Sequence, residues 1–308
     1  MANMWAAALI VLALVVTGAL LFFWLVGERG RWLASTREFF RQSGFRLRTL
    51  HGYIYLRWTP RYVKALLSLP PPASSPQGRK AAGWLADHYH AKVLRHDHAR
   101  AIVGSERDIP LQDLEQIIPY PVVRNIVLHG PPDVVVYECP CRHARATHCE
   151  PTQVCMIIGK PMTDFALEHQ PGLTRRLSQA EALELLKAEH ERGHVHSAWF
   201  KDATLDRFYA ICNCCKCCCG GVTMMRQGVP IMTSSGYVAE IDRELCANCD
   251  DCIEACPFEA LSKNGEGVVR DWERCMGCGV CEVQCATGAV SLVRDERKGI
   301  PLDVRALA

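Results

Sequence analysis

Cysteine is the residue type that sets this chain apart, with 18 in 308 residues. Eight of them form two runs of the same spacing, C-x₂-C-x₂-C-x₃-C, in the last quarter of the chain. The first run holds Cys246, Cys249, Cys252 and Cys256, and the second holds Cys275, Cys278, Cys281 and Cys285. Three thiolates on one tight loop can each reach a different iron of one cluster, whereas the fourth ligand must come from elsewhere. The pattern therefore predicts two iron–sulfur clusters.

The doubled run resembles the bacterial-type 2[4Fe–4S] ferredoxins. The resemblance implies a domain over residues 236–308, in which one strand–loop–helix unit is used twice with pseudo-twofold symmetry. It also implies crossed ligation, because each run of such ferredoxins supplies the other cluster's fourth ligand. One [4Fe–4S] cluster then binds Cys246, Cys249, Cys252 and Cys285, and the second binds Cys275, Cys278, Cys281 and Cys256. A pair of zinc sites is the alternative, but zinc has no use for the third thiolate of each run.

The two runs also differ in ways that bear on redox chemistry. The first has Asn248 and Asp250 where the second has Gly277 and Gly279. Glycine lets backbone N–H groups approach sulfur closely, and a nearby carboxylate disfavours an extra electron. We therefore expect unequal potentials at the two clusters. The residues 263–267 between the halves read Lys-Asn-Gly-Glu-Gly, which predicts a hairpin turn.

The other ten cysteines form a second group, in residues 79–235. They are Cys139, Cys141, Cys149, Cys155, Cys212, Cys214, Cys215, Cys217, Cys218 and Cys219. Thiolates crowded in this way bind a soft metal or a cluster. The first four alone are enough for one cluster, so we expect one or two further iron–sulfur clusters, with iron held through these cysteines. Zinc is the rival metal. Gly220 and Gly221, which follow directly, would let the backbone approach a bound inorganic core.

A second resemblance covers roughly residues 80–290. Cys-Pro-Cys-Arg, two spaced cysteines and Cys-Asn-Cys-Cys-x-Cys-Cys-Cys before a dicluster ferredoxin are similar to a family of membrane-anchored, multi-cluster ferredoxin-like proteins. The resemblance implies clusters and no particular reaction.

An uncharged segment at the N-terminus predicts a membrane anchor. Residues 4–26 are long enough to cross the hydrocarbon core of a bilayer. A cleaved signal peptide is the alternative, but residues 1–3 carry no Lys or Arg and the apolar run is too long. Residues 27–64 are rich in arginine, so the positive-inside rule puts them in the cytoplasm and the N-terminus outside. Unpaired thiolates also favour a reducing compartment. We expect a single-pass protein of the cell inner membrane.

The remaining organisation follows from composition. Residues 27–69 interleave basic and aromatic side chains, which suits contact with membrane lipid, although nucleic-acid contact or an ordinary helix pair is an alternative. Residues 70–78 are rich in proline and serine and predict a linker. We expect an α+β chain with one transmembrane helix, a mixed, mainly helical cysteine-rich middle domain and the C-terminal ferredoxin domain. His88, His90, His96 and His98 are better explained as solvated or capping residues than as metal ligands.

Local patterns place several elements of the middle domain. Residues 133–137 read as a buried strand and residues 194–200 as a second one. Ser178 and Glu181 form a capping box before a helix that ends at Gly193. Apolar residues at helical spacing predict further helices around Leu85, Tyr89, Val93 and Leu94, and around Leu111, Leu114 and Ile118.

Three functions fit these features. The first is an electron-transfer protein that relays electrons to or from a redox partner protein or a membrane oxidoreductase. The second is a reductase subunit with a catalytic cluster among the ten cysteines. The third is a redox or metal sensor that uses the crowded thiols. The sequence contains no G-x-G-x-x-G after a strand and no Walker A motif, so we expect no nucleotide cofactor and no catalytic residue of its own, and a net charge of +2 gives no reason to expect nucleic acid. Catalysis is therefore open, with a carrier favoured.

The topology is tested by fusing reporters to the C-terminus. An uncleaved anchor with the positive flank inside predicts that a reporter active only in the periplasm stays silent there. A reporter that works only in the cytoplasm, fused at the same position, is the matched control and should be active. Periplasmic activity would contradict the orientation.

Overall fold

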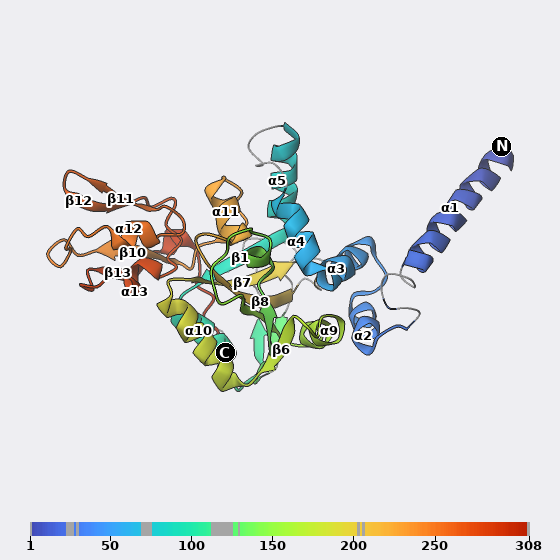
Figure 1. Cartoon of the computed structure of the whole chain (residues 1–308), viewed down its shortest axis with the longest axis horizontal. Coiled ribbons are helices and arrows are strands. Elements are labelled where there is room, and N and C mark those ends of the chain that lie inside the picture. The colour runs from blue at the N-terminus through green and yellow to red at the C-terminus, as the bar shows by residue number, and fades with distance from the viewer. Residues whose placement is uncertain are drawn as a thin grey trace.

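The computed structural model describes residues 2–22, 28, 31–68, 76–111, 126–128, 130–201, 204 and 207–306. Five helices come first along the chain, and the apolar first helix extends away from the remainder in Figure 1. They are α1 (Ala2–Phe22), α2 (Ala34–Ser43), α3 (Leu47–Arg57), α4 (Thr59–Leu67) and α5 (Pro76–His88). Within the described residues, α1 is the one helix long and apolar enough to cross a membrane, over Trp5–Phe22, and none of that window is buried. Its use as an anchor stays a prediction, and residues 23–26 of the predicted span lie outside the described residues.

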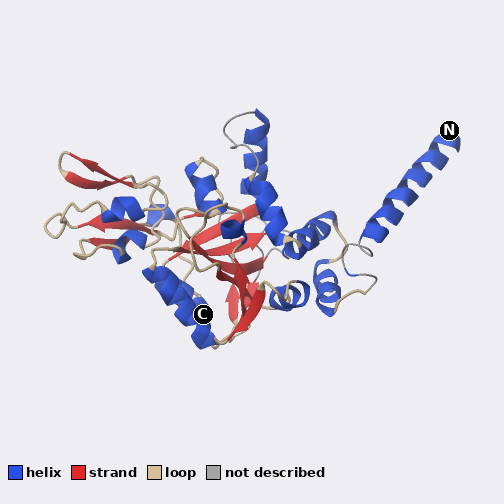
Figure 2. Cartoon of the chain, viewed as in Figure 1, coloured by secondary structure: helices blue, strands red, loops and turns tan. Residues whose placement is uncertain are grey.

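A seven-stranded sheet forms the centre of the middle domain, with helices on both sides of it (Figure 2). In spatial order its strands are β6 (Thr174–Leu177), β4 (Val134–Glu138), β5 (Gln153–Ile158), β8 (Arg207–Cys214), β7 (Val195–Lys201), β1 (Tyr89–Leu94) and β9 (Met232–Thr233). All neighbours pair antiparallel except β1 and β9, which are parallel. The hairpin of β2 (Ile109–Leu111) and β3 (Ile126–Leu128) is separate from it.

Each face of the sheet has its own core, because side chains alternate along a strand. On one face, Ala198, Phe200 and Ile211 pack with α6 (His96–Val103) and α10 (Gln179–Glu191). The other face carries a larger core with Ala91, Val93 and Tyr209 of the strands. This larger core is bordered by α3, α4, α9 (Met162–His169) and α11 (Gly220–Arg226), and the short α8 (Pro140–His143) precedes β5. A sheet covered on both faces is a firm support for any group at its strand ends.

The middle domain is mixed, as expected, but the expectation of a mainly helical domain leaves out the sheet at its centre. The spacing of Tyr89 and Val93 indicates a helix, yet α5 ends at His88 and both residues lie in β1. Spacings of four fit a strand as well as a helix, since every second residue of a strand shares a face. The predicted linker also ends early, because residues 76–78 already belong to α5, and residues 70–75 lie outside the described part of the chain.

Other local predictions are confirmed. The buried strand at residues 133–137 is β4, and the strand at 194–200 is β7. The capping box is present, with Glu181 N donating to Ser178 Oγ and Ser178 N donating to the Glu181 carboxylate, and α10 ends just before Gly193. Leu111 lies in β2, not in a helix, and the helix predicted around Leu114 and Ile118 falls outside the described residues.

Helices α2 to α4 pack on the middle domain, so many of their aromatic side chains do not face lipid. Phe39, Tyr53 and Tyr55 are buried in the larger core, and Phe39 and Tyr53 both contact Phe165 of α9. Exposed apolar side chains remain at Trp32, Phe45 and Leu47, which are 46%, 76% and 87% exposed. Residues 27–69 thus include a wall of the cysteine module as well as any membrane surface.

The C-terminal domain has the expected twofold pattern. Its elements are β10 (Tyr237–Ile241), α12 (Asp251–Ala255), β11 (Leu261–Asn264), β12 (Gly267–Arg270), α13 (Val280–Val283) and β13 (Val290–Arg294), followed by the 3₁₀ turn η4 (Glu296–Lys298). β10 pairs with β13, and β11 pairs with β12 through the predicted hairpin. Each cysteine run follows a strand and continues through a short helix, which holds the third cysteine of the run, Cys252 in α12 and Cys281 in α13.

The two cysteine loops share an uncommon backbone conformation. Asn248 and Asp250 have φ of 53° and 72°, and Gly277 and Gly279 at the equivalent places have φ of 61° and 83°. Of these four positions, Gly277 is the one that also has no room for a side chain, because a Cβ there would lie 2.2 Å from the carbonyl oxygen of Tyr237. The loop of the second run is therefore held tightly against β10, and Ser235 Oγ donates to the carbonyl oxygen of Gly277 at 2.6 Å.

This close approach predicts the effect of Gly277→Ala. Gly288→Ala is the matched control, because Gly288 also has a positive φ but nothing lies within 4 Å of its Cβ position. Both variants carry the backbone penalty, and only Gly277→Ala adds a clash of about 1–3 kcal/mol. In a fixed concentration of denaturant, Gly277→Ala should lose its visible cluster absorbance at least about tenfold faster than the control. Equal rates would contradict the packing argument.

Candidate iron–sulfur sites

The structure brings the last cysteine of each run to the other run's loop. Cys252 lies among Cys285, Cys246 and Cys249, and its pKa is raised by burial and then by the charges of these three neighbours. Cys281 lies among Cys278, Cys256 and Cys275, and its pKa is raised by burial and by their charges. Cys256, Cys275, Cys278 and Cys281 also line one small cavity of about 20 Å³. This is the grouping that crossed ligation needs.

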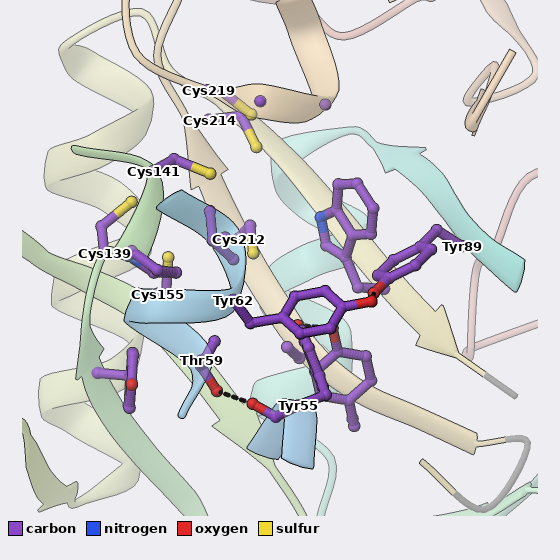
Figure 3. Close-up of a pocket in the computed structure, with 18 of the residues that line it drawn as sticks. Tyr55, Thr59, Tyr62, Tyr89, Cys139, Cys141, Cys155, Cys212, Cys214 and Cys219 are labelled. Atoms are coloured by element: carbon purple, nitrogen blue, oxygen red, sulfur yellow. Dashed lines mark hydrogen bonds between the residues drawn. The ribbon is translucent and has the colours of Figure 1, made fainter. Parts of the chain in front are cut away.

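Seven of the ten middle-domain cysteines line a second, larger cavity, on the face of the sheet covered by α3 and α4 (Figure 3). Six of them contact one another in a closed order, and we call this group the six-thiol ring: Cys139, Cys141, Cys155, Cys212, Cys214 and Cys219. The seventh, Cys215, borders the same cavity but interacts with other thiols. Each thiol interacts with two others in the closed order 139–141–219–214–212–155, back to 139. The cavity volume is about 150 Å³, and a cavity of about this size holds a benzene molecule.

Strand geometry positions the ring. Cys212 and Cys214 are two residues apart on β8, so their side chains share a face. β5 pairs with β8 so that Met156 lies opposite Ile211, which brings Cys155 beside Cys212. The other three ring cysteines come from the segments that follow β4 and precede α11. The ring therefore joins two neighbouring strands and the two helices that follow strand ends.

The two glycines after the motif have a packing role. A Cβ at Gly220 would lie 2.8 Å from Leu67 Cδ2 and 3.6 Å from Cys141 Sγ, and one at Gly221 would lie 2.9 Å from Trp199. Gly220 thus lets α11 approach α4 and the ring closely. The approach to an inorganic core, predicted for these glycines, remains a prediction.

Contacts within the ring lower the pKa of some of its thiols and raise the pKa of others. Hydrogen bonds from Cys141 and Cys155 lower the pKa of Cys139 to about 3. Hydrogen bonds from Cys155 and Cys214 lower the pKa of Cys212 to about 7. The pKa of Cys141 is raised well above its usual value, first through its hydrogen bond with Cys139. Four soft donors are enough for a cubane, so this donor set fits an iron–sulfur cluster.

The remaining four cysteines form a separate group, which we call the four-thiol site. Its members are Cys149, Cys215, Cys217 and Cys218, and their four Sγ atoms all lie within 4.8 Å of one another. Cys139, Cys141, Cys149 and Cys155 are enough in number for one cluster, but the structure places Cys149 with Cys215, Cys217 and Cys218 instead. The loop after α8 carries Cys149 away from the sheet, to the turn that follows β8.

A buried arginine connects the two thiol groups. Arg142 follows Cys141, has no exposed surface, and interacts electrostatically with Cys149, Cys215 and Cys139. One of its Nη atoms donates to the carbonyl oxygen of Pro151, and the other lies 3.2 Å from the buried carboxylate of Glu189. A fixed positive charge at this place offsets thiolate charge in both groups.

The middle domain and the ferredoxin domain are joined beside the cysteines. Lys216 Nζ, in the turn of the four-thiol site, donates to the carbonyl oxygen of Glu254 in α12. Gln284 Nε2, next to Cys285, donates to the carbonyl oxygen of Glu191 at 3.1 Å. One hydrophobic core includes Cys214 and Cys219 together with five buried cysteines of the ferredoxin domain, which are Cys252, Cys256, Cys275, Cys278 and Cys281.

Two groups near these sites were not found from the sequence. His96 lies with His190 and His196, and its Nδ1 is 3.1 Å from His196 Nε2. The rings of His96 and His190 stack with centroids 4.2 Å apart and planes at 9°, so their in-plane lone pairs run parallel and do not converge on one ion. Stacking and hydrogen bonding explain this group.

The second group is at the far wall of the ring cavity. Lys201 is buried, and its Nζ lies 3.6 Å and 3.9 Å from the ring centroids of Tyr89 and Tyr55. Lys201 Nζ also donates to Tyr89 OH, and the aromatic faces around it stabilise its charge. The tyrosines are far apart in the sequence, so no local motif predicted the arrangement.

Comparisons with known proteins agree with the ferredoxin-type pattern. Residues 239–286 match the family of 4Fe-4S dicluster domains. The chain is 44% identical over 55 residues, 17% of its length, to a ferredoxin of Methanocaldococcus jannaschii, of which it spans 89%. Over 56 residues, 18% of its length, it is 34% identical to pyruvate synthase subunit PorD of Methanothermobacter marburgensis, spanning 65% of that protein. Over 92 residues, 28% of its length, it is 34% identical to a tetrathionate reductase subunit of Archaeoglobus fulgidus, spanning 44%. The chain thus spans less than two thirds of these last two proteins.

Crossed ligation is tested with double variants of the full chain. If Cys256 binds the cluster of the second run, Cys256→Ser and Cys249→Ser damage different clusters, so together they should remove about eight irons. Cys275→Ser with Cys256→Ser is the matched control, in which both changes affect one cluster and about four irons are lost. Iron and acid-labile sulfide analysis of anaerobically prepared protein gives the counts. The reverse result would show that each run binds its own cluster.

Proposed function

The chain belongs to the 4Fe-4S dicluster ferredoxin family through its C-terminal domain, and on this premise we propose that it is a membrane-tethered electron-transfer protein. Its relatives from pyruvate synthase and tetrathionate reductase are named as subunits of oxidoreductases, which supports a general role in electron transfer. Beyond this general role, we propose that the chain holds a cluster outside the ferredoxin domain. We also propose that α1 tethers it with the soluble domains on the cytoplasmic face, and that it exchanges electrons with a partner protein.

The continuous core is the observation that carries the proposal. Cysteines of the ring and of both ferredoxin loops lie in one hydrophobic core that runs through both domains. The ferredoxin cysteines would hold two [4Fe–4S] clusters and the ring one more, and such clusters accept and donate single electrons when bound. Burial and hydrogen bonds to sulfur are what the chain uses to set potentials. Ala239 N, for example, donates to Cys275 Sγ at 3.5 Å.

The N-terminal part supplies the tether in this proposal. α1 crosses the inner membrane, and the soluble domains lie on the cytoplasmic face. The exposed side chains of Trp32, Phe45 and Leu47 follow α1 in the chain, and arginines flank them. Aromatic and basic residues next to an anchor suit the headgroup layer. A tether of this kind keeps the clusters beside a membrane oxidoreductase or at the surface where a soluble redox protein arrives.

A reductase is the second candidate, and one observation favours it. The ring offers six thiols where a cubane needs four, and its cavity extends from the sulfur atoms to the apolar wall made by Leu66, Met162 and Phe165. A substrate with an apolar part would fit such a wall, next to sulfur ligands that the cluster does not need.

Metal content and redox titration test the proposal together. We expect about twelve irons per chain in anaerobically prepared full-length protein, since the ferredoxin domain accounts for about eight and a cluster in the ring for about four. Potentiometric titration followed by EPR should show reversible one-electron reduction of at least three centres. Iron confined to about eight per chain would reduce the protein to a simple dicluster ferredoxin.

The same preparation separates a carrier from a reductase. A carrier, once reduced, is reoxidised by an added protein acceptor such as an oxidised flavodoxin and turns over slowly with a small-molecule disulfide. Leu66→Trp fills the apolar wall of the ring cavity and serves as the matched variant. Disulfide turnover that is fast in the native chain and lost in Leu66→Trp would favour the reductase.

A further inference from the structure

The four-thiol site is more compact than a cluster site needs to be. The Sγ atoms of Cys149, Cys215, Cys217 and Cys218 all lie within 4.8 Å of one another, and those of Cys217 and Cys218 are 3.3 Å apart. Four sulfurs around one tetrahedral ion, each at about 2.3 Å, have edges of about 3.8 Å. In a cubane, each thiolate binds a different iron, so the sulfurs stand further apart.

The six-thiol ring provides the contrast within the same domain. Its sulfur atoms surround a cavity of about 150 Å³, which leaves room for an inorganic core. In the four-thiol site, Cys217 interacts with all three of the other thiols, whereas each ring thiol interacts with two of its five companions. Of the four, Cys215 borders the ring cavity and the other three do not. The ring therefore has room for an iron–sulfur cluster, whereas the four-thiol site has room for a single metal ion.

From this geometry we propose that Cys149, Cys215, Cys217 and Cys218 bind a single tetrahedral metal ion of the zinc class, separately from any cluster in the ring. Four thiolates and no other donor select zinc or mononuclear iron among the common metals. The ion is structural, because all four positions are taken by protein ligands and none is left for substrate.

Charge around the site supports this assignment. Four thiolates with one divalent ion carry a net charge of about −2. The buried guanidinium of Arg142 acts on both Cys149 and Cys215, and Lys216 lies within the same turn. The protein thus places positive groups on both sides of the site, one buried and one at the surface.

The site also has a mechanical role. It fixes the turn after β8 to the loop before β5, and Lys216 in that turn donates to Glu254 of α12. Arg226 of α11 holds the same turn, since its Nη2 donates to the carbonyl oxygen of Lys216 at 2.7 Å. The ion therefore secures the segment through which the cysteine module contacts the ferredoxin domain.

The test measures zinc, iron and acid-labile sulfide in the anaerobically prepared full chain. We expect one ion per chain, zinc or iron, with no accompanying sulfide. Cys149→Ser should remove this ion and leave sulfide unchanged. Cys155→Ser is the matched control, because it changes a ring cysteine in β5 and no cysteine of the four-thiol site. It should lower iron and sulfide but keep the ion. Loss of about four irons and four sulfides in Cys149→Ser would overturn the proposal.

A second measurement needs no variant. X-ray absorption at the zinc edge should show four sulfur neighbours at about 2.3 Å, and nitrogen or oxygen neighbours would overturn the assignment. Where iron is the ion, the same shell at the iron edge is masked by the clusters, and Mössbauer spectra should instead show one iron with a mononuclear tetrathiolate signature. The absence of both signatures rules the site out. Electron transfer by the chain is measured independently, so its presence or absence decides neither result.

Discussion

The alternation of side chains along β8 is the constraint on which the cysteine module depends. It turns Cys212 and Cys214 to the same face as Ala210, where α3 and α4 cover the sheet, and the register shift between Phe208 and Ala210 brings Tyr209 into the same core. Tyr55 OH and Tyr209 OH lie 2.8 Å apart and tie α3 to this strand. If the register of β8 slipped by one residue, its cysteines would turn to the opposite face and the ring would lose two members. Helices α3 and α4 are thus part of the site, and a domain boundary at residue 79 would remove one wall of the cavity.

In the ferredoxin domain, the equivalent constraint is backbone conformation. Both cysteine loops need left-handed residues at two places, and the chain meets this need with Asn and Asp in one loop and with Gly in the other. Asn and Asp tolerate this region better than other residues with a side chain. The loops therefore keep the same path with different surroundings, since Lys263 pairs with Asp250 at 2.8 Å in the first loop only. Differences of this kind around equal ligand sets are what separate two potentials.

Sequence reasoning succeeded where the determinant is local. The paired runs, the hairpin between them, the capping box at Ser178 and the strand β4 all depend on residues within a few positions of one another. It failed where partners are distant. The place of Cys149 is set by its approach to Cys215, and the sheet is built from strands such as β1 and β7 that are about a hundred residues apart. The membrane-surface interpretation of residues 27–69 failed for Tyr53 and Tyr55 for the same reason, because their burial depends on α9 and β8.

The eight-residue motif at Cys212–Cys219 shows why counting cysteines could not assign them. Its first two cysteines end a strand, its next three lie in a turn, and Cys219 is the N-cap residue of α11, so successive side chains diverge. Cys218 thus belongs to the four-thiol site and its neighbour Cys219 to the ring. One short segment consequently carries ligands for two sites, and Lys216 in its middle reaches the ferredoxin domain. Any change that moves this turn alters both thiol groups and the contact with the ferredoxin domain. The motif therefore couples the two thiol groups to each other and to that domain.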